Sequence, residues 1–242
     1  GAAEALGSGP SKSSQTMRDR DRFVHWLRLA SHSTPDYWRR AGPLNPTVAR
    51  KFTLLQAGER EDLFFRWFRF DEGTAVDWYA HENGYTFSNG RAGGGGQSFI
   101  EALAVWSQAP GRVNYRYAGS TDATARLHEV DGQNTILWED PFDEIAGRYD
   151  CRRGGALAVG TVTIAFGNRE FAGRRYMDIA EADVLTQDGA GCAFEGNGGR
   201  NGTEVFVHEL GHTLGFGHSC GDEFSPVCRV GSLLDRSVMR SI

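Results

Sequence analysis

The stretch NGTEVFVHELGHTLGFGH, residues 201–218, carries three of the seven histidines of this 242-residue chain. Asn201 followed three residues later by Glu204 predicts the start of a helix, and Gly215 predicts its end, because glycine adopts the left-handed conformation without steric cost. Between these limits, apolar residues recur at the spacing of a helix buried on most sides. They are Val205, Phe206, Val207, Leu210 and Leu214.

Two of the histidines share one face of this predicted helix. His208 and His212 are four residues apart, so their imidazoles stack one turn apart and can reach the same ion. A turn at Gly215 lets the chain double back and bring in His218 as a third metal ligand. Three neutral imidazoles leave one tetrahedral position open, which is typical of a catalytic rather than a structural zinc site. We therefore expect one catalytic Zn²⁺ ion as the cofactor.

Glu209 follows the first of these histidines directly and points about 100° away from it around the helix axis. Such a carboxylate sits beside the metal without ligating it. Zinc lowers the pKa of bound water, and the glutamate can take the proton as the water attacks a carbonyl, then pass it to the leaving amine. The pattern predicts peptide hydrolysis with Glu209 as the catalytic base and acid. The alternative is that the histidines only satisfy hydrogen bonds in a buried helix.

The composition excludes several kinds of partner. A net charge of -5 and a pI near 5.8 provide no basic surface for nucleic acid. No apolar run approaches the roughly 20 residues that span a bilayer, so we expect no membrane association. The sequence begins without an initiator Met or an apolar leader, from which we expect a processed form that is secreted or extracytoplasmic. Its partners are then protein or peptide substrates.

The four cysteines are even in number and form no CxxC pair. They indicate two disulfides in an oxidising compartment rather than a second metal site, and four cysteines allow three pairings. We favour Cys151 with Cys192 and Cys220 with Cys228, because the second pair closes a short loop just after His218. Unpaired buried thiols are the alternative.

The composition also divides the chain into three parts. Residues 1–16 are small and polar and are expected to form a disordered tail. Residues 17–72 are charged and aromatic, with a short helix expected between residues 18 and 40, and could be an N-terminal extension, a pro-segment or part of the core. Residues 73–242 are expected to form the catalytic domain, with an upper subdomain to residue 215 and a lower one from 216 to 242 that could be C-terminally truncated.

Hydrophobic periodicity within the catalytic domain predicts an α/β fold. A helix follows the glycine run 93–96 and is begun by a capping box of Ser98 and Glu101. The glycine run lacks the Gly-Lys-Ser/Thr ending of a phosphate-binding loop and is taken as a flexible connection. One strand, one helix and then several strands imply a largely parallel sheet. The predicted strands lie within residues 74–81, 112–119, 134–140, 156–166 and 178–185.

HELGHTLGFGH, residues 208–218, resembles the zinc-binding pattern of the metzincin metalloproteases at every fixed position, and Ser219 is similar to the residue found there in the matrixin branch. DRSVMRSI, residues 235–242, resembles the Met-turn of that family. The resemblance implies His208, His212 and His218 as ligands and Met239 beneath the zinc. It also implies a twisted, mostly parallel five-stranded sheet with residues 156–166 as its antiparallel edge strand, two long helices and a small C-terminal subdomain.

The sequence departs from animal matrixins in several places. No cysteine precedes Cys151, so the thiol latency switch cannot operate, and an inhibitory N-terminal segment would need another blocking group such as Asp36. The connection 141–153 has no histidine to bind a second, structural zinc ion. Three acids within this connection are candidate Ca²⁺ ligands, although a solvated acidic loop is the alternative. These acids are Asp143, Glu144 and Asp150.

Together, these features predict a secreted zinc-dependent endopeptidase. The alternative is a latent, zinc-bound interaction protein whose N-terminal segment occupies the cleft or binds a partner. Glu209 favours the enzyme, because a binding module has no need of a general base beside the metal.

Overall fold

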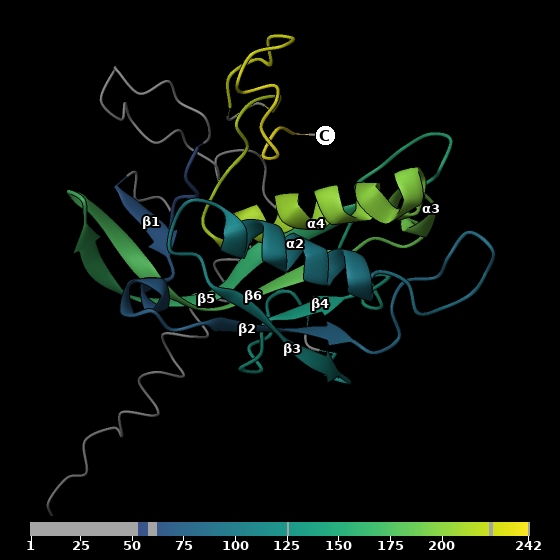
Figure 1. The fold of residues 1–242 in the computed structure, drawn as a ribbon, viewed down its shortest axis with the longest axis horizontal. Coiled ribbons are helices and arrows are strands. Elements are labelled where there is room, and N and C mark those ends of the chain that lie inside the picture. Colours follow the sequence, from purple (N-terminus) through teal and green to yellow (C-terminus); the bar gives the residue numbers. More distant parts are fainter. Residues whose placement is uncertain (1–52, 58–61, 125, 223–224, 242) are drawn as a thin grey trace, which may run out of the picture.

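A computed structural model describes residues 53–57, 62–124, 126–222 and 225–241 of the chain. Three helices accompany a six-stranded, mostly parallel sheet, and the two long helices lie side by side on one face of it (Figure 1). The predicted α/β fold is confirmed. The helix expected between residues 18 and 40, and Asp36 within it, lie outside the described residues.

The sheet has one antiparallel strand at its edge. Five strands run in parallel in the order β1-β6-β4-β2-β3, and β5 pairs with β6 in antiparallel orientation. Among the described residues β5 pairs with no other strand, so its second edge is open. The strands are β1 (Leu63–Arg66), β2 (Val76–His81), β3 (Tyr115–Thr121), β4 (Thr135–Leu137), β5 (Ala158–Phe171) and β6 (Arg174–Thr186).

The predicted count of five strands is wrong, because β1 adds a sixth. Its four residues, LFFR, are three apolar residues without alternation followed by Arg66, and such a run does not distinguish a strand from a buried helix. β1 pairs with the first half of β6. The boundary that we expected at residue 73 therefore falls between the 3-10 helix η1 (Phe68–Glu72) and β2, inside one sheet layer.

The helices are α2 (Gly96–Gln108), the short α3 (Gly191–Phe194) and α4 (Arg200–Thr213), with a 3-10 turn, η2 (Gly196–Gly199), before α4. Both predicted caps are wrong. Gly95 and Gly199 occupy the N-cap positions, and neither helix has a side-chain cap. Ser98 instead donates to the carbonyl of Gly199, and Asn201 donates to that of Ala193. The two polar side chains are used for contacts between elements.

Aromatic side chains hold α4 against the sheet. Phe206 of α4 is fully buried, and its ring centroid lies 6.3 Å from that of Phe99 on α2, 5.7 Å from Trp138 and 5.2 Å from Phe194. Full burial of one such side chain stabilises a fold by about 1.5–3 kcal/mol. The helix that carries two of the candidate ligands is thus fixed by the main core.

The described residues after α4 contain no named helix or strand, and residues 235–239 among them pack against α4 (Figure 1). Both favoured disulfides are present, Cys151–Cys192 and Cys220–Cys228, and they suggest an extracellular or otherwise oxidising environment. No helix within the described ranges is long and apolar enough to cross a membrane.

Candidate metal centre

Helix α4 places the first two histidines of the centre. The Nε2 atoms of His208 and His212 lie 3.1 Å apart. The helix then stops at Gly215, which has φ +88° and whose added Cβ would lie 2.5 Å from the Phe65 carbonyl oxygen. Only glycine combines this left-handed backbone with so close an approach. The predicted end of the helix is confirmed.

His218 reaches the same point from the turn that follows. Its Nε2 atom lies 3.1 Å from that of His208, and the ligand atoms of the three histidines are all within 4.8 Å of one another. The backbone of His218 is held by Thr53, whose hydroxyl donates to its carbonyl at 3.0 Å. The structure thus brings together the three histidines that the sequence predicts to share an ion.

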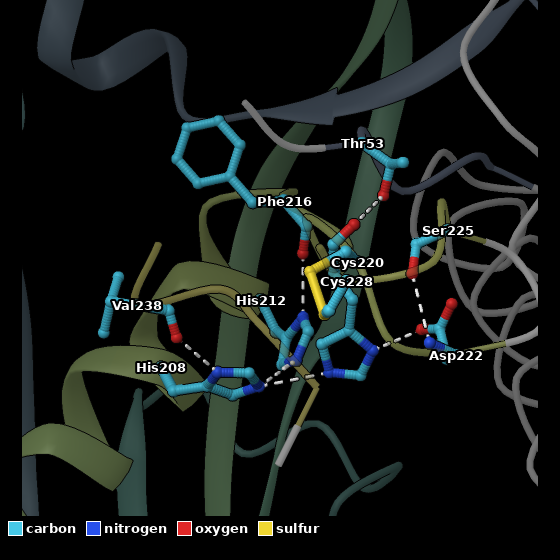
Figure 2. A network of polar contacts seen from close by, with 10 residues as sticks. Thr53, His208, His212, Phe216, Cys220, Asp222, Ser225, Cys228 and Val238 are labelled. Atoms are coloured by element: carbon cyan, nitrogen blue, oxygen red, sulfur yellow. Dashed lines mark hydrogen bonds and ion pairs between the residues drawn. A yellow bond between two sulfur atoms is a disulfide. The ribbon is translucent and has the colours of Figure 1, made fainter. Parts of the chain in front are cut away.

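Each of the three rings donates its Nδ1–H to an oxygen atom outside the centre (Figure 2). Two acceptors are backbone carbonyls and the third is a carboxylate, so none of them supplies a hydrogen of its own. The proton of each ring therefore sits on Nδ1, and the Nε2 lone pair faces the other two rings. The pairs are His208 with Val238 at 2.7 Å, His212 with Phe216 at 2.8 Å, and His218 with Asp222.

This arrangement fits a metal ion. Three Nε2 lone pairs that face one another repel, unless a cation lies between them. Tetrahedral ligation at the usual zinc–nitrogen distance of about 2.0–2.1 Å separates two nitrogens by roughly 3.3 Å, close to the 3.1 Å of the His208–His212 pair. Desolvation by burial lowers the pKa of His208 to about 4 and that of His212 well below its usual value. Both rings are neutral, as metal ligands must be.

Glu209 lies beside the histidines on α4 and is buried, with 6 % of its surface exposed. Its Oε2 accepts a hydrogen bond of 2.6 Å from the backbone N–H of Gly160 in β5. Burial raises the pKa of the Glu209 carboxyl to about 8, and the Gly160 bond acts in the opposite direction. A Cβ on Gly160 would lie 2.2 Å from the Glu209 carbonyl oxygen, so only glycine lets β5 approach the helix this closely.

An open cavity of about 710 Å³ exposes this group of side chains. Glu209 and the three histidines line it together with Thr53, Tyr149 and the first residues of β5. A second cavity of about 580 Å³, also lined by His208, lies between α4 and the C-terminal segment. Both cavities are bounded by Tyr149 and Leu157.

Met239 packs against the helix next to the ligands. It is 2 % exposed, and a Cβ on Gly211 would lie 2.2 Å from its Sδ atom. The Met239 carbonyl accepts a 2.7 Å hydrogen bond from the N–H of Ser219. The packing of Met239 on Gly211 joins the C-terminal segment to α4, at a position between His208 and His212 in the sequence.

The structure does not gather the three candidate calcium ligands. Glu144 accepts from the N–H of Leu127, and Asp150 accepts from the N–H groups of Arg152 and Arg153. In the parts of the chain that the structure describes, the three histidines are the only group of three or more potential metal ligands. Asp150 thus acts in a local turn, and Glu144 joins two loops that are 17 residues apart.

Sequence reasoning missed several residues of the centre. Asp222 lies inside the loop bounded by Cys220 and Cys228, and an acid so near a ligand histidine was a signal that could have been used. Gly160 and Thr53 gave no such signal, because they meet the centre only through packing of β5 and of the segment before β1.

The comparisons with known proteins return no match. No protein-family model matches the chain, and no curated protein or solved structure matches it either. The metal centre must therefore be interpreted from its own geometry and from the resemblance of residues 208–219 and 235–242 to the metzincin pattern.

Proposed function

We propose that this protein is a secreted, zinc-dependent endopeptidase of the metzincin type, similar to the matrixin branch. The observation that carries the proposal is a buried carboxylate, Glu209, beside three imidazoles whose Nε2 atoms converge at the wall of an open cavity. Zinc bound by these imidazoles would supply a Lewis acid that polarises a carbonyl group and makes water a better nucleophile. Two disulfides support an extracellular location.

Glu209 is the residue that moves the proton. One of its oxygens is held by the N–H of Gly160, which fixes the orientation of the carboxylate toward the cavity. The ionised form of Glu209 accepts a proton from the attacking water and passes it to the nitrogen of the leaving amine. Burial keeps bulk water from competing for the carboxylate. The three histidines would hold the ion through their converging Nε2 atoms.

The substrate is an extended peptide. Residues 157–160, at the start of β5, line the cavity beside Glu209, and the open edge of β5 can pair with a peptide backbone. The second cavity, which His208 also lines, is lined in part by Val205 and Val238. It can accept a substrate side chain next to the bond that is cut.

A hydrolysis assay tests the proposal. The full chain loaded with zinc is expected to cleave casein or a quenched peptide, and a chelator is expected to abolish cleavage. Replacing Glu209→Gln should lower the rate by about 10²- to 10⁴-fold, because the general base is lost, while the zinc content stays unchanged. The matched control is Glu82→Gln, an exposed glutamate in the turn after β2. It should cleave at the wild-type rate.

Two outcomes would contradict this mechanism, namely cleavage that a chelator leaves unchanged and a fully active Glu209→Gln variant. A zinc-loaded chain that hydrolyses no peptide would favour the alternative of a latent interaction protein. Thr53 and Leu55 line the same cavity as Glu209, so the N-terminal part of the chain meets the cleft at its rim.

A further inference from the structure

The third histidine is held differently from the other two. His208 and His212 stand on a helix that the core fixes, and their Nδ1–H groups donate to backbone carbonyls. His218 lies beyond the helix, where no regular element fixes its ring. Its Nδ1–H donates to the carboxylate of Asp222 instead. The Nδ1–H of His218 thus has a carboxylate as its acceptor, whereas the Nδ1–H groups of His208 and His212 have backbone carbonyls.

The position of Asp222 is fixed by a small closed loop. The Cys220–Cys228 disulfide closes it, and the backbone N–H of Gly221 donates to the Pro226 carbonyl at 3.0 Å. The N–H of Asp222 donates to the hydroxyl of Ser225 at 3.2 Å (Figure 2).

The loop is anchored to the rest of the chain through its first cysteine. Cys220 is fully buried, and its carbonyl accepts a hydrogen bond of 2.9 Å from the N–H of Ser241. Gly221, with φ +102°, provides the turn, and a Cβ there would lie 3.2 Å from the Cys228 sulfur. The backbone that carries the Asp222 side chain is therefore constrained.

We propose that Asp222 is a positioning residue for the ligand His218, and that the Cys220–Cys228 disulfide holds Asp222 in place, so that this loop sets the affinity for the metal. The inference rests on the proposed function only in that the three histidines bind zinc. A carboxylate behind a ligand imidazole fixes its tautomer and orientation and makes it more basic. Loss of such a partner typically weakens metal binding by about 10- to 100-fold.

The charge of the site makes the carboxylate more important. Among the described residues, the cluster contains the three imidazoles and neither a carboxylate nor a thiolate. Asp222 is bonded directly to one of them and brings a negative charge close to the ion. Removing it leaves the loop ring with no fixed partner for Nδ1.

The test is the dissociation constant of the full chain for Zn²⁺, measured by competition with a chelating dye. Asp222→Ala is expected to bind zinc about 10- to 100-fold more weakly than wild type. Cys220→Ser/Cys228→Ser should show a loss of similar size. The matched controls are Asp235→Asn, an acid of the same C-terminal segment, and Cys151→Ser/Cys192→Ser at the other disulfide. Both should bind within about two-fold of wild type, since neither contacts a ligand histidine.

Combining the changes tests whether the disulfide acts through Asp222. If it does, Asp222→Ala in the Cys220→Ser/Cys228→Ser background lowers the affinity little further, because coupled residues are not additive. If the losses of zinc affinity from Asp222→Ala and from the cysteine variant multiply, the disulfide does not act through Asp222. Should the cysteine variant fail to fold, Asp222→Ala alone still decides the role of the carboxylate.

The absorption spectrum of the Co²⁺-loaded protein separates positioning from general stability. Asp222→Ala should alter the spectrum. Asp222→Asn keeps an acceptor oxygen, so its spectrum should resemble that of wild type and its zinc affinity should lie between those of wild type and Asp222→Ala. Tight zinc binding by Asp222→Ala with an unchanged spectrum would overturn the positioning role of Asp222 and leave the metal site itself in place. A wild-type chain that binds no zinc overturns the metal site itself.

Discussion

The two regions that form the metal centre are built by different means. The upper region, comprising the described residues up to 215, places His208 and His212 on a helix that is buried against an aromatic core. The lower region, residues 216–222 and 225–241, has no named helix or strand and exposes large apolar side chains. These are Val227, Val230 and Leu233. Burial places two ligands, and cross-links place the third.

The largest difference is expected in the free energy of unfolding. Phe206→Ala in the upper region should lower it by about 3–5 kcal/mol, because a buried aromatic ring is lost and a cavity remains. Leu233→Ala in the lower region, where the side chain is 60 % exposed, should change it by less than about 0.5 kcal/mol. Urea unfolding of the two variants measures both values. Equal losses would show that the lower region has a core of its own.

The two disulfides should rank in the opposite order for stability and for metal binding. Cys151–Cys192 closes 41 residues and Cys220–Cys228 closes 8. The chain-entropy model then gives losses of about 4 and about 2.5 kcal/mol when each pair is changed to serine. Loss of Cys220–Cys228 should therefore lower the free energy of unfolding less than loss of Cys151–Cys192 does. It should nevertheless weaken zinc binding more. A common ranking in the two measurements would mean that the loop acts only through stability.

The two regions should also differ in how their free energy of unfolding depends on pH. Burial raises the pKa of Asp183 on β6 well above its ordinary value of 3.8, against hydrogen bonds from Thr163 and Thr135. Because its pKa is raised in the folded state, Asp183 stabilises the folded state relative to the unfolded state below pH 3.8. This contribution is lost as the pH rises through the folded-state pKa. The unfolding free energy of wild type should therefore fall relative to Asp183→Asn by up to about 1.4 kcal/mol per pH unit above that point.

Asp235 in the lower region should respond in the other direction. Hydrogen bonds from the Gly231 N–H and from Arg240 lower its pKa. Its contribution is present above pH 3.8 and is lost as the pH falls, so Asp235→Asn should differ from wild type only above that point, and weakly, because the group is exposed. Titration of unfolding between pH 3 and 7 measures both variants. If the differences from wild type changed with pH in the same direction for Asp183→Asn and Asp235→Asn, the predicted contrast between the two acids would be wrong.

The sequence predicted those parts of the protein that depend on local periodicity. The strands β2 to β6, the helices α2 and α4, and the stop at Gly215 follow from the spacing of apolar residues and from the conformational freedom of glycine. The helix caps failed because Ser98 and Asn201 bond to other elements. The strand β1 was missed because its three consecutive apolar residues show no periodicity.

The sequence by itself determined which side chains could share an ion, because the i, i+4 spacing and the turn at Gly215 are local properties of the backbone. It also indicated a carboxylate beside them. Only the tertiary structure decided which oxygens orient the three rings, that Gly160 holds Glu209, and that Asp222 stands behind His218. These partners are brought in by sheet pairing, core packing and a disulfide, which act between residues that no short period connects.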